Sequence, residues 1–183
     1  MRQVIGLAAL LLACAPAAEA QRYLPGMRGL EAVGGMVEGR GYYLHGGYSQ
    51  YTRGKNRWAL AAEYLQRRFA WETGAIPLEQ LTVEAGFYKL LFGDAGKSIF
   101  FAAGVSALTG YETVNRNRKQ LPNGAVIGNA DRWLYGIAAA VELEYYVDDR
   151  YVFLATIKQR AGGGSSVGLF HTQLGVGVKY ILE

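Results

Sequence analysis

Hydrophobic and polar residues alternate with a period of two over most of the chain beyond residue 26, which is the spacing of a β-strand with two different faces. Eight such segments can be marked, and turn-forming residues separate them. They cover residues 27–38, 41–53, 57–70, 77–92, 98–112, 131–147, 151–160 and 169–182. The pattern therefore predicts an all-β chain of eight strands.

The predicted strands have one apolar face and one face of polar or small residues. In the sixth, Trp133, Ile137 and Val141 share a face, and Gly136 and Glu142 lie on the other. Tilted strands of about nine to eleven residues can cross a bilayer with the apolar face toward lipid. An open sheet would leave its edge N–H and C=O groups unpaired in lipid, so the sheet must close. We expect an eight-stranded antiparallel up-and-down β-barrel of the outer-membrane type, filled by its own side chains.

The connections between the predicted strands alternate in length. The second, fourth and sixth are compact turn sequences at residues 54–56, 93–97 and 148–150. The third, fifth and seventh lie at residues 72–76, 113–130 and 161–168, and the fifth is the longest. Outer-membrane barrels have short periplasmic turns and longer external loops. We therefore expect both termini on the periplasmic side.

Aromatic residues near the predicted strand ends would form the interfacial girdles of a membrane barrel. They are Trp58, Tyr111, Trp133, Tyr145, Tyr151 and Tyr180. Trp71 is out of phase with Trp58 in the same segment, which predicts a bulge or a loop position for Trp71.

Residues 1–20 have the parts of a secretory signal, so we expect a signal peptide followed by a barrel domain at residues 21–183. A basic residue precedes an apolar run at 4–12, and Ala18-Glu19-Ala20 provides a cleavage site. Cys14 allows an alternative, because it ends a lipobox-like sequence and would then be lipidated. Cleavage after residue 20 would leave no cysteine, and so no disulfide or thiolate metal site.

The charge of the chain is mildly basic, with 19 lysines and arginines against 15 acidic residues and a net charge of +4. A nucleic-acid-binding protein usually has a dense basic face. Here the basic residues are scattered among acidic ones, so direct DNA contact is not expected. The densest basic cluster is Arg116, Arg118 and Lys119 in the longest connection. This cluster would contact DNA, lipopolysaccharide or a partner protein, unless it is simply a solvated loop tip.

The faces predicted to point inward carry acidic and basic side chains in nearly equal number. They are Glu63, Arg67, Glu84, Glu112, Glu142, Glu144, Lys158, Arg160, His171 and Lys179. Paired carboxylates can perform acid–base catalysis. Buried charges in a barrel interior must also be paired, and the near balance favours this structural interpretation.

Other candidate sites match their motifs poorly, so no catalytic residue, cofactor or metal is predicted. His45 and His171 lie far apart in sequence without further ligands at a suitable spacing. A Ser-His-acid triad would lack the usual G-x-S-x-G elbow. Residues 91–98 resemble a phosphate-binding loop, but Leu91 replaces its first glycine and a strand follows, so a hairpin turn is expected.

The last predicted strand carries Gln173, Gly175, Val178 and Tyr180, a spacing that resembles the C-terminal signal read by the bacterial barrel-assembly machinery. The usual terminal aromatic residue is displaced, because three residues follow Tyr180.

Several blocks of the chain resemble the conjugative transposon protein TraO family. They lie at residues 21–26, 34–37, 62–65, 106–115 and 164–177, of which the last two are the most specific. The resemblance implies a role in conjugative DNA transfer within an envelope-spanning secretion apparatus, and it brings no catalytic residues. We hypothesise that Ser165, Ser166 and His171, in the last block, lie on a rim that contacts a partner.

Together these features predict a non-enzymatic structural component of a conjugative apparatus, placed in the bacterial outer membrane. Its expected partners are outer-membrane lipid and other conjugation proteins. One alternative is an outer-membrane enzyme or lipid-binding barrel. Another is a soluble lipocalin-like barrel, which would have the reverse polarity, with an apolar interior.

Overall fold

The computed structural model describes residues 24–39, 41–71, 74–115, 132–163 and 170–182. It contains eight strands and one 3-10 turn at Arg53–Lys55. The strands are β1 (Arg28–Val37), β2 (Gly41–Thr52), β3 (Asn56–Trp71), β4 (Gly74–Gly93), β5 (Ile99–Val114), β6 (Arg132–Tyr146), β7 (Tyr151–Gly163) and β8 (Phe170–Leu182). Every predicted strand is present, and the ends differ from the predicted ones by three residues at most.

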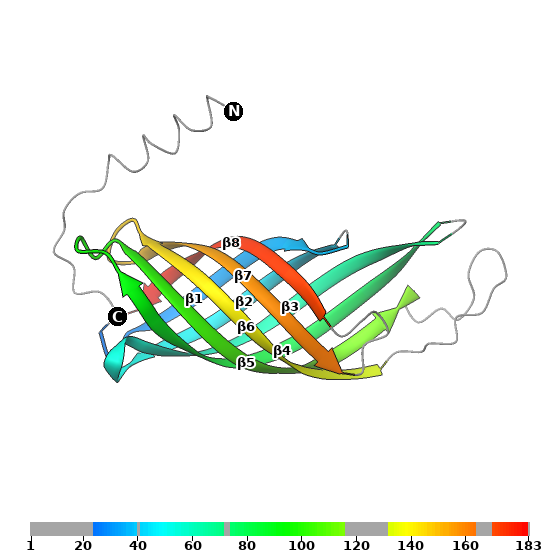
Figure 1. The fold of residues 1–183 in the computed structure, drawn as a ribbon, viewed down its shortest axis with the longest axis horizontal. Coiled ribbons are helices and arrows are strands. Elements are labelled where there is room, and N and C mark those ends of the chain that lie inside the picture. The colour runs from blue at the N-terminus through cyan, green and yellow to red at the C-terminus, as the bar shows by residue number, and fades with distance from the viewer. Residues whose placement is uncertain (1–23, 40, 72–73, 116–131, 164–169, 183) are drawn as a thin grey trace, which may run out of the picture.

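The eight strands form one closed antiparallel barrel in chain order, which confirms the predicted fold class (Figure 1). Each strand pairs with the next along the chain, and β8 pairs with β1 to complete the ring. This last pairing runs from Arg28 opposite Leu182 to Val37 opposite Gln173. Because the ring is closed, the paired strands have no free edge along the wall.

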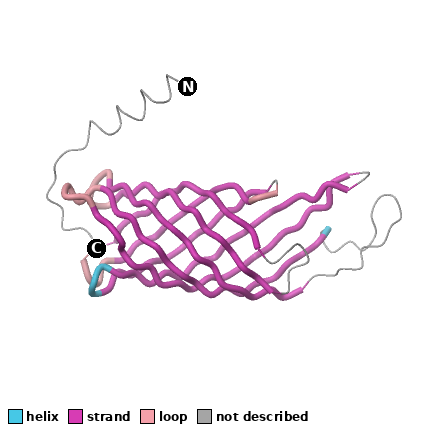
Figure 2. Tube along the Cα trace, in the orientation of Figure 1, coloured by secondary structure: helices cyan, strands magenta, loops and turns pink. Residues whose placement is uncertain are grey.

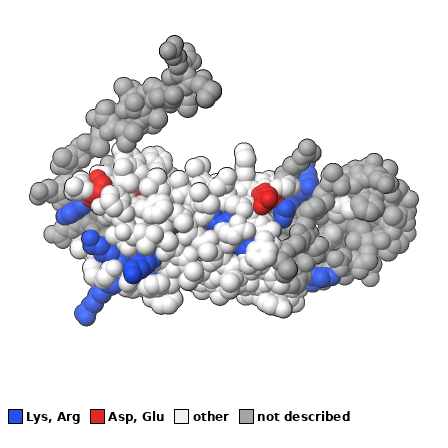
Figure 3. Space-filling view, in the orientation of Figure 1, with Lys and Arg blue, Asp and Glu red and all other residues white. Residues whose placement is uncertain are grey.

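The outer surface of the barrel wall is apolar, as the alternation predicts. Met36, Trp133 and Val176 are 70% exposed or more, although they are large hydrophobic residues. On the face drawn in Figure 3, charged side chains gather mainly toward the two ends, and uncharged residues cover most of the band between them. No helix in the described ranges has the length and apolar character that a membrane-crossing helix needs. The exposed apolar band is what a strand wall facing lipid requires.

The two ends of the barrel differ in their connections (Figure 2). At the short-turn end, compact turns join β2 to β3, β4 to β5 and β6 to β7, and the paired ends of β1 and β8 lie beside them. At the opposite, long-connection end, β5 and β6 are separated by residues 115–131 and β7 and β8 by residues 164–169. The short turns at one end and the long fifth and seventh connections at the other are as predicted, whereas the connections from β1 to β2 and from β3 to β4, at the long-connection end, are short.

Aromatic pairs flank the apolar band on the outer wall. The Trp58 and Phe87 rings are 4.9 Å apart near the short-turn end, as are Tyr151 and Tyr180 at 5.2 Å. Tyr111 and Trp133 form a pair at 5.8 Å toward the long-connection end. This arrangement agrees with the predicted girdles.

The hairpin of β3 and β4 corrects two predictions. Trp71 is neither in a bulge nor in a loop, because β3 and β4 keep an unbroken register up to Trp71 opposite Gly74. The predicted connection at 72–76 is also too long, since β4 already begins at Gly74. The reason is that this hairpin extends past its neighbour β2, which begins at Gly41 opposite Arg67. Beyond that point the alternation no longer separates a lipid face from an interior face.

Candidate functional site

The barrel interior holds a network of buried ionisable side chains, which we call the interior charge network. Its members come from seven of the eight strands because every second residue of each strand points inward. They are Glu31, His45, Arg57, Glu63, Glu84, Glu142, Glu144, Lys158, Arg160 and Lys179. All ten have side chains that are 9% exposed or less. Charges buried to this degree are tolerated only when they are paired.

One half of the network surrounds Arg57 and Lys179, nearer the short-turn end. The Arg57 guanidinium donates hydrogen bonds to Glu142, at 2.7 Å, and to Glu144. Lys179 Nζ lies 3.2 Å from Glu142 Oε1 and 2.5 Å from Glu144 Oε1. Arg57 also stacks over the ring of Tyr88, 4.4 Å from its centroid. The two cations therefore neutralise two adjacent carboxylates. The face of the Tyr88 ring covers one of the cations, Arg57.

The other half of the network is built on Glu63 and Glu84 of adjacent strands. Arg160 bridges these carboxylates, with NH1 2.8 Å from Glu63 and NH2 2.9 Å from Glu84. Lys158 Nζ lies 2.9 Å from Glu84 Oε2. Gln173 donates to Glu63 Oε1 and Ser106 donates to Glu84 Oε1, both at 2.7 Å. The carboxylate oxygens are thus engaged by cations, an amide and a hydroxyl.

His45 connects the two halves. Its Nε2 lies 3.4 Å from Glu31 Oε1 and its Nδ1 lies 3.6 Å from Glu63 Oε2. Lys179 Nζ in turn lies 3.3 Å from Glu31 Oε2. The ten side chains consequently form one continuous charged network through the barrel.

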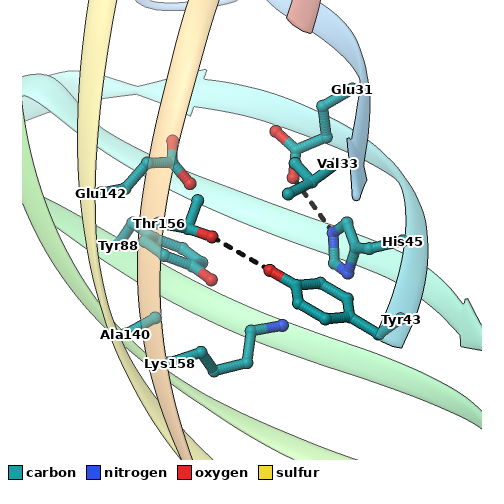
Figure 4. A pocket seen from close by; sticks show the side chains of 9 residues that line it. All are labelled: Glu31, Val33, Tyr43, His45, Tyr88, Ala140, Glu142, Thr156 and Lys158. Atoms are coloured by element: carbon teal, nitrogen blue, oxygen red, sulfur yellow. Dashed lines mark hydrogen bonds and ion pairs between the residues drawn. The ribbon is translucent and has the colours of Figure 1, made fainter. Parts of the chain in front are cut away.

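A cavity of about 20 Å³ lies beside His45, with Glu31, Tyr43 and Lys158 among its lining residues (Figure 4). The Tyr43 side chain extends across this region, and its hydroxyl oxygen lies 3.3 Å from Thr156 Oγ1, within hydrogen-bond distance. A cavity of this size holds about one water molecule. This cavity among the described side chains of the network is therefore far smaller than a substrate pocket.

His45 also lies in the one place where the described residues could hold a metal ion. Ligand atoms of His45, Glu63 and Glu84 lie within 4.8 Å of one another. Spacing along the sequence did not reveal this grouping, because the three residues come together only where β2, β3 and β4 are adjacent in the wall. Lys158 and Arg160 already supply positive charge to the same carboxylates, however, so a metal ion would have to displace them.

Sequence reasoning found most of the network. All ten residues predicted to face inward occupy inward positions in the strand registers. Glu31, His45 and Arg57 were missed as inward-facing residues. The same alternation could have found Arg57, which is in phase with Glu63 and Arg67 on β3.

The predicted partner-contact rim lies mostly beyond the described residues, because Arg116, Arg118, Lys119, Ser165 and Ser166 fall in undescribed segments. Only His171 is described. It is half-buried on the inward side of β8, opposite Arg160 of β7. The rim therefore stays a prediction.

The predicted assembly signal lies entirely on β8. Gln173 and Gly175 face the interior, where Gln173 donates to Glu63, whereas Val178 and Tyr180 face outward. Recognition by an assembly machinery stays a prediction. Residues 91–98 form the end of β4 and a hairpin turn into β5, which confirms the interpretation of this sequence as a turn.

Known structures share this architecture. Neisserial surface protein A is similar over 84% of this chain and 95% of its own, with 12% identity and a TM-score of 0.61. The N-terminal β-barrel domain of Pseudomonas aeruginosa OprF is similar over 86% and 98%, with 12% identity and a TM-score of 0.58. Ail of Yersinia pestis is similar over 87% and 100%, with 11% identity and a TM-score of 0.57. At these identities the likeness establishes the barrel fold.

Sequence comparison gives the family. Among curated proteins there is no match to the chain. The family model of conjugative transposon protein TraO, in contrast, matches residues 24–182, which is nearly the whole barrel and confirms the resemblance of its sequence blocks. The chain belongs to the conjugative transposon protein TraO family.

Proposed function

We propose that this protein is a non-enzymatic structural component of a conjugative DNA-transfer apparatus, anchored as a β-barrel in the bacterial outer membrane. Its barrel holds position in the membrane, and its long-connection end presents loops to other proteins of the apparatus. The family supports the link to conjugation. The fold it shares with OprF, NspA and Ail supports the outer-membrane location.

The observation that carries this proposal is the polarity of the barrel. Its outer wall exposes large apolar side chains, and its interior is filled by ion pairs such as Arg57–Glu142 and Arg160–Glu63. A lipocalin-like barrel would need the opposite polarity, with an apolar cavity for its ligand. An enzyme would need room for a substrate beside its ionisable groups, and the cavity beside His45 has a volume of only about 20 Å³.

A barrel of this kind contacts other proteins chiefly through its ends, because lipid covers its wall. We assign the partner contacts to the long-connection end, where the longest connection carries Arg116, Arg118 and Lys119. The neighbouring connection carries Ser165 and Ser166, followed by His171 at the start of β8. The termini and the short turns at the other end would face the periplasm.

The proposal is tested by conjugation frequency in a strain that lacks the gene and is complemented with variants. Deletion should abolish transfer, and the intact gene should restore it. Replacing Arg116, Arg118 and Lys119 by glutamine, or Ser165, Ser166 and His171 by alanine, should lower transfer about tenfold or more, because a few residues carry most of the binding energy of an interface.

A matched control replaces Arg53 and Lys55 by glutamine in the exposed turn at the short-turn end, which should leave transfer intact. Each variant must appear in outer membranes at the level of the parent. Full transfer without the gene would contradict a role in conjugation. Full transfer with both sets of loop substitutions would contradict docking through these loops.

A further inference from the structure

The interior charge network, as the described residues form it, contains one more carboxylate than it contains permanent cations. Its five carboxylates belong to Glu31, Glu63, Glu84, Glu142 and Glu144. Its four permanent cations are Arg57, Lys158, Arg160 and Lys179. An uncompensated charge is costly at this degree of burial. His45 is the remaining member of the network, so its protonation decides whether the charges balance.

His45 lies between two of these carboxylates, with one at each ring nitrogen. Nε2 is 3.4 Å from Glu31 Oε1, and Nδ1 is 3.6 Å from Glu63 Oε2. An ionised carboxylate accepts hydrogen bonds and has none to donate, so each ring nitrogen needs a proton of its own to face it. A neutral imidazole has a single N–H and would turn a lone pair toward one of the two oxygens.

The contact between His45 and Glu63 also joins two buried atoms that have no hydrogen-bond partner among the described residues. They are His45 Nδ1 and Glu63 Oε2, and their side chains are 9% and 0% exposed. A proton on Nδ1 gives both atoms a partner, because it places a donor opposite an acceptor.

The other groups around His45 leave this need in place. They are Glu84 on β4, Glu142 on β6, Lys158 on β7, and the hydroxyls of Tyr43 on β2 and Tyr88 on β4. Lys158 is one of the four cations already counted, and so is Lys179 on β8, which lies 3.3 Å from Glu31. The cavity beside His45, of about 20 Å³, holds about one water molecule and has no room for a hydrated metal ion. A proton is the cation that fits.

We propose that His45 is a proton-binding site and that the folded barrel holds this side chain as an imidazolium at neutral pH. Nε2–H then donates to Glu31 and Nδ1–H donates to Glu63, which links β2 to both of its neighbours through the interior. The bound proton brings the network to five positive charges against five negative ones. The inference rests on the proposed function only in that the barrel is folded in a lipid bilayer, and it does not involve the loops.

The direct test is nitrogen NMR of the full chain with labelled histidine, folded in lipid vesicles at neutral pH. His171→Gln leaves His45 as the single histidine, so its ring gives the only labelled signals. An imidazolium has a proton on both nitrogens and two signals close together, whereas a neutral ring has one bare nitrogen and two well-separated signals. We expect two protonated nitrogens. A bare ring nitrogen on His45 would overturn the proposal.

A second test uses the sign of one substitution in two backgrounds, read as the urea midpoint in the same vesicles. Glu31→Gln in the parent removes a charge from a balanced network and should lower the midpoint. In a His45→Gln barrel, Glu31→Gln leaves four carboxylates against four cations and should raise the midpoint. Glu38→Gln, at an exposed carboxylate, is the control and should change both midpoints little.

A higher midpoint for Glu31→Gln in the parent would mean that His45 is neutral there, and it would overturn the proposal. The heat-induced mobility shift of each variant on a gel reports separately on the barrel. A neutral His45 in a chain that keeps this shift would refute the inference alone, whereas loss of the shift in the parent would count against the membrane barrel itself.

Discussion

Arg57 shows how single residues hold this barrel together. Its side chain is 1% exposed, contacts Glu142 and Glu144 from the far side of the barrel, and lies over Tyr88. Arginine suits this position because its guanidinium stays charged and binds two carboxylates at once. Removing one partner of such a group leaves uncompensated charge in a dry interior, which costs more than the pair itself contributes.

Arg57→Met should lower the free energy of unfolding by about 3 to 5 kcal/mol, because Lys179 would be left as the one cation facing Glu142 and Glu144 in this half of the network. Urea titration in lipid vesicles, followed by tryptophan fluorescence, measures the change. Arg53→Met in the exposed turn is the matched control and should have little effect. Adding Glu144→Gln should recover part of the loss. Equal stability of the two single variants would show that the network does not bear on stability.

Gly175 makes a second prediction at this scale. A Cβ atom here would clash with the Tyr43 hydroxyl and lie 2.9 Å from both Tyr43 Cζ and Val33 Cγ1. Gly175→Ala should therefore destabilise the barrel by about 1 to 3 kcal/mol through overpacking. Combination with Tyr43→Phe should cost less than the sum of the two single changes, because the hydroxyl is removed.

The control for this prediction is Gly46→Ala on β2, where no atom lies within 4 Å of the added Cβ. It should leave the urea midpoint close to that of the parent. A Gly175→Ala barrel as stable as the Gly46→Ala barrel would mean that the interior around Tyr43 is loosely packed and can absorb an added methyl group.

The sequence predicts which residues face the barrel interior, but it does not predict which of them pair with one another. Alternation along β6 places Glu142 and Glu144 inside, and it does so because the period of a strand is two. That Arg57 reaches both of them depends on which strands face each other across the barrel. The alternation within one strand carries no information about which side chains meet across the barrel. The same limit applies to His45, whose carboxylate neighbours come from β1 and β3.

At the scale of elements, the short turns are closed by aspartates that accept backbone hydrogen bonds. Asp94 Oδ1 accepts from the N–H groups of Ser98 and Ile99, both at 2.7 Å. Asp148 Oδ1 accepts from Arg150 at 2.7 Å and Tyr151 at 2.6 Å. Such side chains satisfy backbone groups that the ladder leaves unpaired, and they set where the next strand begins.

Asp94→Ala should destabilise the barrel by about 1 to 2 kcal/mol, because it removes two hydrogen bonds at the β4–β5 turn. The urea titration in vesicles again provides the measurement. Asp149→Ala at the β6–β7 turn serves as a comparison, because Asp149 is exposed and follows directly after Asp148. Its loss of stability should be smaller, since Asp148 is the residue that accepts the hydrogen bonds from the backbone at the start of β7. A larger effect at residue 149 than at residue 94 would refute this role of the turn aspartates.

Strand positions were the most predictable feature, because period-two alternation sustained over ten or more residues matches a half-buried strand and does not match the 3.6-residue period of a helix. The β3–β4 hairpin was the exception. Its end beyond Arg67 pairs without β2 beside it, so the alternation there does not follow the lipid and interior faces. The register shift between Leu90 and Phe92 on β4 could not be predicted either. The sequence around it is apolar, and an apolar run fits a bulged strand as well as a regular one.

At the scale of the whole molecule, the polarity of the barrel links its sequence to its place in the cell. An apolar wall of exposed side chains needs a hydrocarbon solvent, and a ring of eight paired strands meets the requirement that no backbone group be left unpaired there. Closure could be predicted on those grounds. The family, rather than the physics of the wall, connects such a barrel to conjugation.

A closed barrel resident in the outer membrane can be tested in one experiment, in which expressing cells are fractionated and the outer membranes are run on a gel with and without boiling. We expect the protein in the outer-membrane fraction. We also expect the unboiled protein to migrate differently from the boiled one, since the paired ring resists detergent until heat opens it. A protein found in the soluble periplasmic fraction, with one mobility under both conditions, would show that the chain does not form a barrel in this membrane.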